Sequence, residues 1–218
     1  MKKILLTGFE PFNQDSINPS WEAVKLLDGL NTHLFHVRSI ELPCVFGQSV
    51  QQLSKAIALT QPDIVIAVGL AAGRSEISVE RVAINIDDAR IPDNANNQPI
   101  DIPVVADAPA AYFSTLPIKA IVQKIRQEGI PAGVSQSAGS FVCNHVFYGL
   151  MHHVAQHSPN LRAGFIHVPA IPQQVAKGGS NANQPSMSLT DIVRGLRIAL
   201  AVCCTQQHDI VVAGGQTS

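Results

Sequence analysis

The stretch SFVCNHVFYGLMH, residues 140–152, places a cysteine at the start of a predicted amphipathic helix, directly after the small residues of SQSAG. A thiol in the first turn of a helix faces unpaired amides and the positive end of the helix dipole, and both favour the nucleophilic thiolate. Free cysteine is also among the most buried residue types, so core packing is the competing interpretation of Cys143. Cys44, before another predicted helix, is a weaker candidate, and a helical pattern around Cys203 and Cys204 favours core packing for both.

A cysteine nucleophile needs a base within hydrogen-bonding reach, and the chain has eight histidines. His167 ends the apolar strand pattern RAGFIH, so we expect it at the same edge of a parallel sheet as Cys143. The alternative is that His167 ends the strand and bonds only to backbone. His33 and His36 lie near the start of a predicted strand, at the opposite edge, and His145 is two residues from Cys143 and points to another face of the helix.

The third candidate is a carboxylate at an irregular point of a strand pattern. The period-2 alternation of apolar residues slips by one at Glu80 and Arg81, which predicts a bulge or a break in the strand. A carboxylate in such a buried segment needs a partner, so Glu80 is the candidate that orients the histidine. A salt bridge with Arg74 or Arg81 is the alternative. The apolar positions that define the slip are Ile77, Val79, Val82, Ile84 and Ile86.

Other polar clusters have simpler explanations. His153 and His157 form an HxxxH pair that lacks the glutamate of HExxH, and a solvated helix face is favoured over a metal site. The four cysteines have no CxxC spacing, so neither a zinc cluster nor a disulfide framework is indicated. Turn formation and loop solvation are expected for Asp87, Asp88 and Asp93.

The elements that would position these residues follow an α/β pattern, in which apolar runs that end in Gly or Pro alternate with segments of helical period. A loop rich in Asn, Asp and Pro is predicted over 87–103, and 209–218 is ambiguous. The predicted strands lie within 2–9, 34–43, 62–74, 76–86, 131–139 and 162–171. The predicted helices lie within 19–30, 45–60, 114–129, 140–154 and 188–207.

Length and charge narrow the possible classes of protein. A chain of 218 residues can bury one substantial core, so we expect a single domain over 1–218, with 206–218 as a possible loose C-terminal tail. The balance of 15 basic and 16 acidic residues provides no overall attraction to nucleic acid or to a membrane. Because no signal-peptide core or membrane-spanning run is present and the thiols are expected to be reduced, the sequence predicts a cytoplasmic protein.

Four stretches, LLTGFEPF, GRSEISVERVAINIDDARIPDN, SAGSFVCNHVFYGLMH and GFIHVPAIPQQ, together resemble pyroglutamyl peptidase type I, a cysteine peptidase family. The resemblance covers residues 3 to about 205, and no family counterpart of 206–218 is identified. Its catalytic residues match Glu80, Cys143 and His167. The resemblance also implies an α/β/α sandwich with a twisted, mostly parallel sheet, removal of N-terminal pyroglutamate from peptides, no metal or organic cofactor, and a homotetramer.

The resemblance extends to the substrate pocket. Phe9 and Phe12 match its aromatic positions, which suits an uncharged lactam ring, although core packing is the alternative for either ring. Arg90 matches an arginine that would help to stabilise an oxyanion, alongside the backbone N–H of Cys143. Leu70 stands where the family usually has Gln, which removes one expected hydrogen bond to the substrate, worth about 1 kcal/mol.

Two other functions are compatible with the same residues. A binding protein on this scaffold would keep the pocket and lack turnover because of the changes at Leu70 and Ala72. A cysteine amidase would act on another small lactam or amide. The intact set of Cys143, His167 and Glu80 argues against the binding protein, since binding alone does not need all three.

Overall fold

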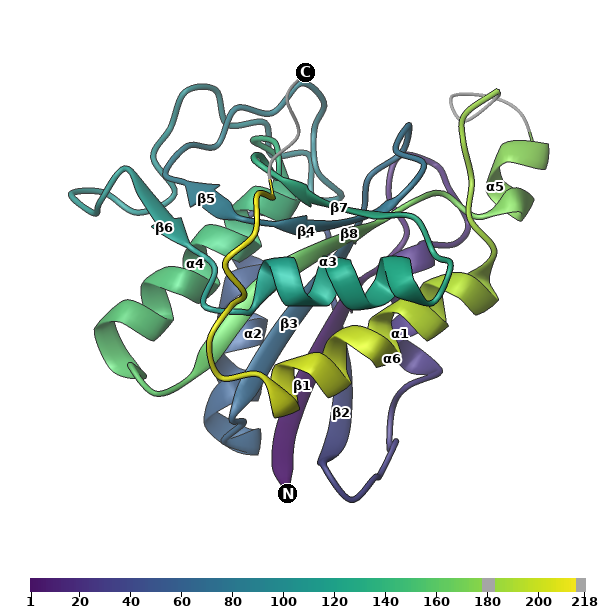
Figure 1. Cartoon of the computed structure of the whole chain (residues 1–218). Coiled ribbons are helices and arrows are strands. Elements are labelled where there is room, and N and C mark those ends of the chain that lie inside the picture. The colour runs from purple at the N-terminus through teal and green to yellow at the C-terminus, as the bar shows by residue number, and fades with distance from the viewer. Residues whose placement is uncertain (178–182, 215–218) are drawn as a thin grey trace.

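The computed structural model describes residues 1–177 and 183–214, and a six-stranded sheet forms its centre (Figure 1). The strand order is β2-β1-β3-β8-β4-β7. β4 and β7 are parallel to each other, whereas β4 runs antiparallel to β8, so the sheet is mostly parallel, as predicted. The strands are β1 (Lys2–Phe9), β2 (Phe35–Leu42), β3 (Ile64–Leu70), β4 (Ile77–Glu80), β7 (Ala132–Ser135) and β8 (Arg162–Val168).

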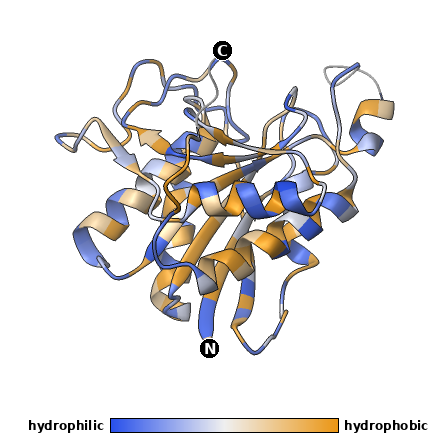
Figure 2. Cartoon of the chain, in the orientation of Figure 1, coloured by the Kyte–Doolittle hydropathy of each residue, from blue (hydrophilic) through white to orange (hydrophobic). Residues whose placement is uncertain are grey.

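Helices cover both faces of the sheet and enclose two apolar cores, which confirms the predicted α/β fold. One face carries α1 (Pro19–Lys25), α3 (Ile118–Gln127) and α6 (Leu189–Thr205), and the other carries α2 (Gln48–Thr60) and α4 (Val142–His157). Figure 2 shows the hydrophobic residues concentrated on the central strands. None of the helices in the described part of the chain is long and apolar enough to cross a membrane.

The phase slip at Glu80 and Arg81 is a strand break between two sheets. β4 ends at Glu80, and β5 (Val82–Ile84) pairs with β6 (Ala111–Phe113) in a separate two-stranded sheet. The backbone of Arg81 is held at the break, because its N–H donates to Ser135 O and its carbonyl accepts from the Ser114 N–H. The sequence did not predict β6, which is too short and too exposed to show a clear alternation.

One helix is shorter than predicted, and another helix was not predicted. The helix predicted over 19–30 ends at Lys25. The Leu27 N–H donates to Val24 O, three residues back, which tightens the last turn, and Gly29 then adopts a positive φ of 73°. A short helix, α5 (Pro172–Ala176), follows β8 in a stretch for which the sequence predicted no element.

The long loop over 87–103 contains no helix or strand, as predicted, but its acidic residues are more than solvated turn formers. Asp87 is buried, forms backbone bonds with Ile102 and holds the His145 ring by its carboxylate. Asp93 is also buried and accepts from the N–H groups of Phe46, Ala95 and Asn97. The expectation of loop solvation was therefore wrong for both, whereas turn formation is confirmed for Asp93, whose partners Ala95 and Asn97 are local.

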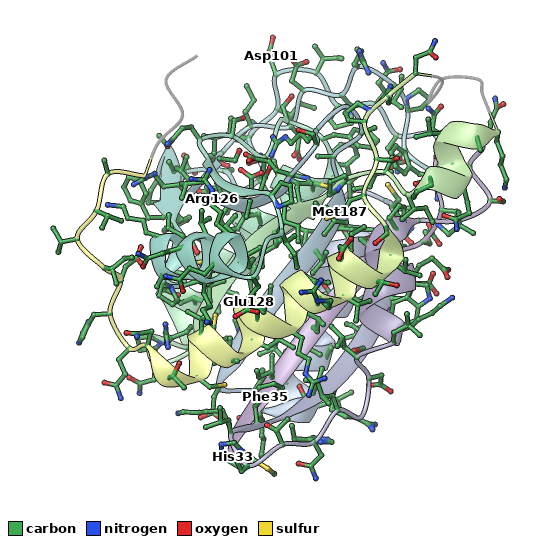
Figure 3. The ribbon with its side chains drawn as sticks, turned by 45° about the vertical axis from the view of Figure 1, so that its right-hand side comes forward. His33, Phe35, Asp101, Arg126, Glu128 and Met187 are labelled. Carbon is green, nitrogen blue, oxygen red and sulfur yellow. The ribbon has the colours of Figure 1, made fainter. Side chains whose placement is uncertain are left out.

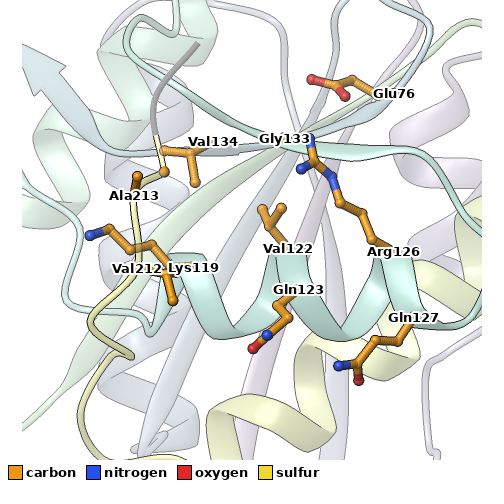
Figure 4. A pocket seen from close by; sticks show the side chains of 11 residues that line it. Glu76, Lys119, Val122, Gln123, Arg126, Gln127, Gly133, Val134, Val212 and Ala213 are labelled. Carbon is orange, nitrogen blue, oxygen red and sulfur yellow. The ribbon is translucent and has the colours of Figure 1, made fainter.

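After α6 the described chain passes the N-terminal end of α3 (Figure 1). The Asp209 carboxylate accepts from the N–H groups of Lys119 and Ala120 at the start of α3, and the Arg81 guanidinium donates to Gly214 O. The rest of the predicted tail, 215–218, lies outside the described residues. A cavity of about 640 Å³, here called the α3 cavity, opens between α3, β7 and this C-terminal segment (Figure 4).

Candidate active site

Three neighbouring strands bring the candidate residues to one face of the sheet. In the antiparallel β4–β8 pair Ser78 is opposite His167, so Glu80 lies on the same face, diagonal to His167. In the parallel β3–β8 pair Gly69 is opposite His167. Glu80, His167 and Gly69 therefore form a row across β4, β8 and β3, on the face that α4 covers.

The nucleophile candidate enters this row from α4. Phe141 is the N-cap and supplies no side-chain acceptor, so the first-turn amides, including that of Cys143, have no side-chain cap. The next residue, Asn144, is buried and fixes the helix start to β5 by bonding the Ile84 N–H and the Ile84 and Ile86 carbonyls. The position of the thiol thus depends on a helix start that is itself anchored.

The carboxylate and the imidazole form a short hydrogen bond. His167 Nδ1 lies 2.7 Å from Glu80 Oε1, and the two residues are 4% and 0% exposed. A neutral imidazole that donates from Nδ1 has its lone pair on Nε2, which is the arrangement a general base needs. The sequence-based choice of Glu80 as the orienting carboxylate is consistent with this geometry.

Arg74 binds the same carboxylate. Its Nη1 lies 2.7 Å from Glu80 Oε1 and its Nη2 donates to Ser137 O. Burial by itself raises the pKa of Glu80, but the bonds and charges of His167, Ser135 and Arg74 outweigh burial and hold that pKa below its usual value. The salt bridge weighed as an alternative role for Glu80 thus coexists with the imidazole contact, and Arg74 is a site residue that the sequence suggested only as that alternative.

Cys143 is a half-buried residue, and it lines a pocket together with His167. Burial raises the pKa of the Cys143 thiol above the usual value, Cys44 and Glu80 raise it further, and Arg74 acts in the opposite direction. The net direction is the reverse of that expected from the helix dipole. A thiol with a raised pKa needs a base before it can act as a nucleophile, and an imidazole lines the same pocket.

The pocket has a volume of about 270 Å³ and is here called the thiol pocket. Its walls include three of the four predicted substrate residues, Phe9, Phe12 and Leu70. Phe9 is buried and packs on Phe165, with ring centroids 6.3 Å apart, so it also serves the core. Phe12 packs on Phe141, a further wall residue that the sequence did not suggest, although it directly precedes the α4 helix.

Arg90, the fourth predicted residue, is exposed and is not among the residues that line the thiol pocket. The loop that carries it reaches the start of α4, because the Asp88 N–H donates to Ser140 O and the Ser140 hydroxyl donates to Asp88 O. The structure therefore brings the Arg90 loop to the site but leaves the side chain outside the cavity.

The other histidines and cysteines have different positions. His145 accepts from the Gly47 N–H at Nε2 and contacts Asp87 at Nδ1, so both ring nitrogens are occupied. His33 lies at the opposite end of the molecule from Asp101 of the long loop (Figure 3). Cys44 lines the thiol pocket, but burial raises its pKa to about 12, and Cys203 is buried in a core. Within 1–177 and 183–214, no group of three or more His, Cys, Asp or Glu could hold a metal ion.

A thiol, an imidazole and a buried carboxylate around one pocket of an α/β sheet are the side chains with which cysteine hydrolases work. A sequence model of the pyroglutamyl peptidase family matches residues 2–206. The chain belongs to the pyroglutamyl peptidase family and is a hydrolase of the cysteine peptidase class.

Individual relatives agree with this assignment. The chain is 52% identical over 218 residues to the pyrrolidone-carboxylate peptidase of Brevibacillus brevis, with 100% of both chains covered. It is 55% identical over 216 residues to pyrrolidone-carboxylate peptidase 1 of Ralstonia nicotianae, with 99% of both covered. The first of these alignments includes the C-terminal segment, for which no counterpart was identified from the sequence alone.

Solved structures have the same fold. The crystal structure of pyroglutamyl peptidase I from Bacillus amyloliquefaciens superposes with a TM-score of 0.94 at 49% identity, covering 97% of this chain and 99% of that one. A mutant pyrrolidone carboxyl peptidase from the hyperthermophile Pyrococcus furiosus superposes with a TM-score of 0.89 at 46% identity, covering 92% and 97%.

Proposed function

We propose that this protein removes pyroglutamate from the amino terminus of peptides, with Cys143 as nucleophile, His167 as general base and acid, and Glu80 as the residue that orients His167. The observation that carries the proposal is the 2.7 Å contact between Glu80 and His167 Nδ1 beside the pocket that holds the Cys143 thiol. Membership of the pyroglutamyl peptidase family supports the choice of substrate.

In the first half of the reaction the thiol proton passes to His167 Nε2 while Cys143 Sγ attacks the carbonyl carbon of the pyroglutamyl residue. The negative charge that develops on the carbonyl oxygen is stabilised by first-turn N–H groups of α4, which have no side-chain cap. His167 then donates its proton to the nitrogen of the departing amine. The peptide leaves with a free amino terminus, and a thioester joins Cys143 to the pyroglutamyl group.

In the second half His167 takes a proton from water, and the oxygen of that water attacks the thioester carbon. The thiolate leaves, recovers the proton from His167, and free pyroglutamate is released. Throughout the cycle the Glu80 carboxylate holds the Nδ1–H of His167 and stabilises the imidazolium. Arg74 supports this role because its charge helps to keep the buried carboxylate ionised.

The chemistry of the pocket fits a lactam. Pyroglutamate has no charged amine, so its recognition does not need an acidic residue and relies on an apolar space with a few polar partners. Phe9, Phe12 and Leu70 supply apolar walls of the thiol pocket. Arg90 stays a predicted contributor to oxyanion stabilisation, and its exposed position supports that role less than the position of the α4 amides does.

The test is release of a fluorescent amine from a pyroglutamyl amide, compared with the same amide of glutamine and of proline. We expect hydrolysis of the pyroglutamyl compound alone and its loss in Cys143→Ala, while the matched control Cys44→Ala, at the other thiol of the pocket, keeps turnover. Activity that survives in Cys143→Ala would remove this thiol from the mechanism. Turnover of the open-chain amides alone would favour the cysteine amidase, and a folded, reduced protein without turnover would favour the binding protein.

The homotetramer implied by the family resemblance is also a proposal. Light scattering of the purified protein after size-exclusion chromatography gives the mass directly, and four times the chain mass of 23.3 kDa is the expected result.

A further inference from the structure

The side chains that β3 presents to α4 become smaller towards the active site. Val65 and Ala67 belong to the core between the sheet and the α2–α4 layer, and Gly69 is the next residue on that face. Gly69 is not among the glycines with a positive φ, so its backbone conformation is one that any residue adopts. The reason for a glycine here is therefore space.

That space is occupied by the thiol. A Cβ atom added at Gly69 would lie 2.8 Å from Cys143 Sγ and 2.8 Å from Phe165 Cζ, whereas ordinary contacts begin at 3.4 Å. The Phe165 ring cannot give way easily, because it packs on Phe9, Phe147 and His167. A side chain at position 69 would therefore push the sulfur outwards.

The direction of this displacement affects the chemistry. Gly69 is paired with His167 across β3 and β8, so the sulfur rests on the sheet beside the strand position that carries the base. Glu80 on β4, His167 on β8 and the Cys143 sulfur above β3 therefore lie in one row. The sulfur occupies the space that a side chain at position 69 would fill. Displacement of the sulfur from this place would change its position relative to the imidazole.

We infer that Gly69 is a positioning residue for the proposed reaction, because the absence of its side chain lets the Cys143 sulfur rest on β3 beside His167. The expected change in rate rests on the proposed function, whereas the steric contact does not depend on it. Misplacement of a reacting group by about 1 Å costs on the order of 10²-fold in rate. We therefore expect Gly69→Ala to lower kcat by about 10²-fold with little change in KM, since the walls of the pocket stay in place.

The matched control is Gly164→Ala in the adjacent strand β8. Its added Cβ would lie 2.4 Å from Ser114 Oγ and 2.7 Å from Leu116 Cδ1, a contact as tight as the one at Gly69 but with no triad residue. We expect this variant to lose thermal stability and to keep kcat once folded. An equal fall of kcat in both variants would overturn the inference, because the effect at 69 would then be general to strand glycines.

A double-mutant cycle in thermal unfolding tests the contact without any substrate. Gly69→Ala should lower the unfolding temperature less in the Cys143→Ala background, which lacks the sulfur, than in the wild type. If Gly69→Ala lowers the unfolding temperature equally in the wild type and in Cys143→Ala, the steric contact involves Phe165 alone and the inference fails. Should Gly69→Ala not fold, the same cycle is run in the Phe165→Leu background, which removes the other contact.

The rate at which iodoacetamide alkylates Cys143 separates this inference from the proposed function. We expect slower alkylation of Cys143 in Gly69→Ala than in wild type, read by mass spectrometry of the peptide that contains it. If pyroglutamyl amides are not hydrolysed but the cycle and the alkylation behave as stated, the proposed function fails and the positioning role stands. Unchanged alkylation with unchanged kcat would overturn the positioning role.

Discussion

The thiol pocket has less than half the volume of the α3 cavity, about 270 Å³ against about 640 Å³. The smaller space holds a thiol, an imidazole and the arginine that binds the buried carboxylate. The larger space has Glu76, Lys119, Gln123 and Arg126 on its walls (Figure 4). Both cavities therefore contain polar groups, and volume does not distinguish the one that supports chemistry.

The difference lies in how the polar groups are held. At the thiol pocket, Glu80 is fully buried and its Oε1 is shared by His167 and Arg74, so three side chains act on one another in fixed positions. In the α3 cavity the Arg126 Nε donates to the Ala132 carbonyl, a contact that joins α3 to β7. A catalytic site is recognised by buried polar side chains that bond to one another. The polar side chains of a structural cavity instead bond to the backbone of neighbouring elements.

The sharpest test of this comparison replaces the buried carboxylate behind the thiol pocket and a carboxylate on the wall of the α3 cavity. Glu80→Gln should lower kcat/KM by about 10²- to 10⁴-fold, because an amide can hold the imidazole but cannot stabilise the imidazolium. Glu76→Gln in the α3 cavity should keep kcat/KM within about twofold of the wild-type value. Steady-state kinetics with the pyroglutamyl amide measures both. Equal losses in the two variants would show that the cavities are not functionally distinct.

The pH dependence of Cys143 alkylation tests the raised pKa of this thiol. In His167→Ala, which removes the base, alkylation should increase by about tenfold per pH unit through neutral and mildly alkaline pH, since the thiolate is the reactive form and the thiol pKa lies above that range. The wild type should react faster at neutral pH and depend less steeply on pH. A plateau near pH 7 in His167→Ala would contradict the raised pKa.

A smaller effect is expected at the wall of the thiol pocket. Leu70→Gln adds an amide to an apolar wall, and a hydrogen bond to the lactam worth about 1 kcal/mol would lower KM by about fivefold. Leu70→Met, which keeps an apolar side chain of similar size, is the control and should leave KM close to the wild-type value. A KM that rises in Leu70→Gln would show that the apolar wall itself binds the ring.

The smallest effect is expected from the segment beside the α3 cavity, and only on stability. Asp209→Ala removes the carboxylate that caps α3, which should cost about 1 kcal/mol and lower the Tm by about 2–4 °C. Asp209→Asn keeps an acceptor and should lose less. Thermal unfolding followed by circular dichroism measures both, and kcat below the transition should be unchanged. A fall in kcat would instead connect this segment to the active site, through Arg81 and Gly214.

The amino-acid sequence was most informative where local pattern and chemistry coincide. The slip of alternation at Glu80 is a property of neighbouring residues, so it revealed the strand break without knowledge of the fold. The positions of Cys143 after a small-residue loop and of His167 at the end of an apolar run are local in the same sense. The sequence was less informative for β6 and α5, which are too short to build a periodic pattern.

The sequence by itself therefore determined the alternation of strands and helices. It also determined that Glu80 and His167 lie near the ends of strands and that Cys143 lies at the start of a helix. Only the tertiary structure decided that β8 lies between β3 and β4, that β4 runs antiparallel to β8, and that Arg74 reaches the Glu80 carboxylate. The physical reason is that periodicity records which face of an element is buried. Strand order and direction, in contrast, are set by contacts between residues that are distant in the chain.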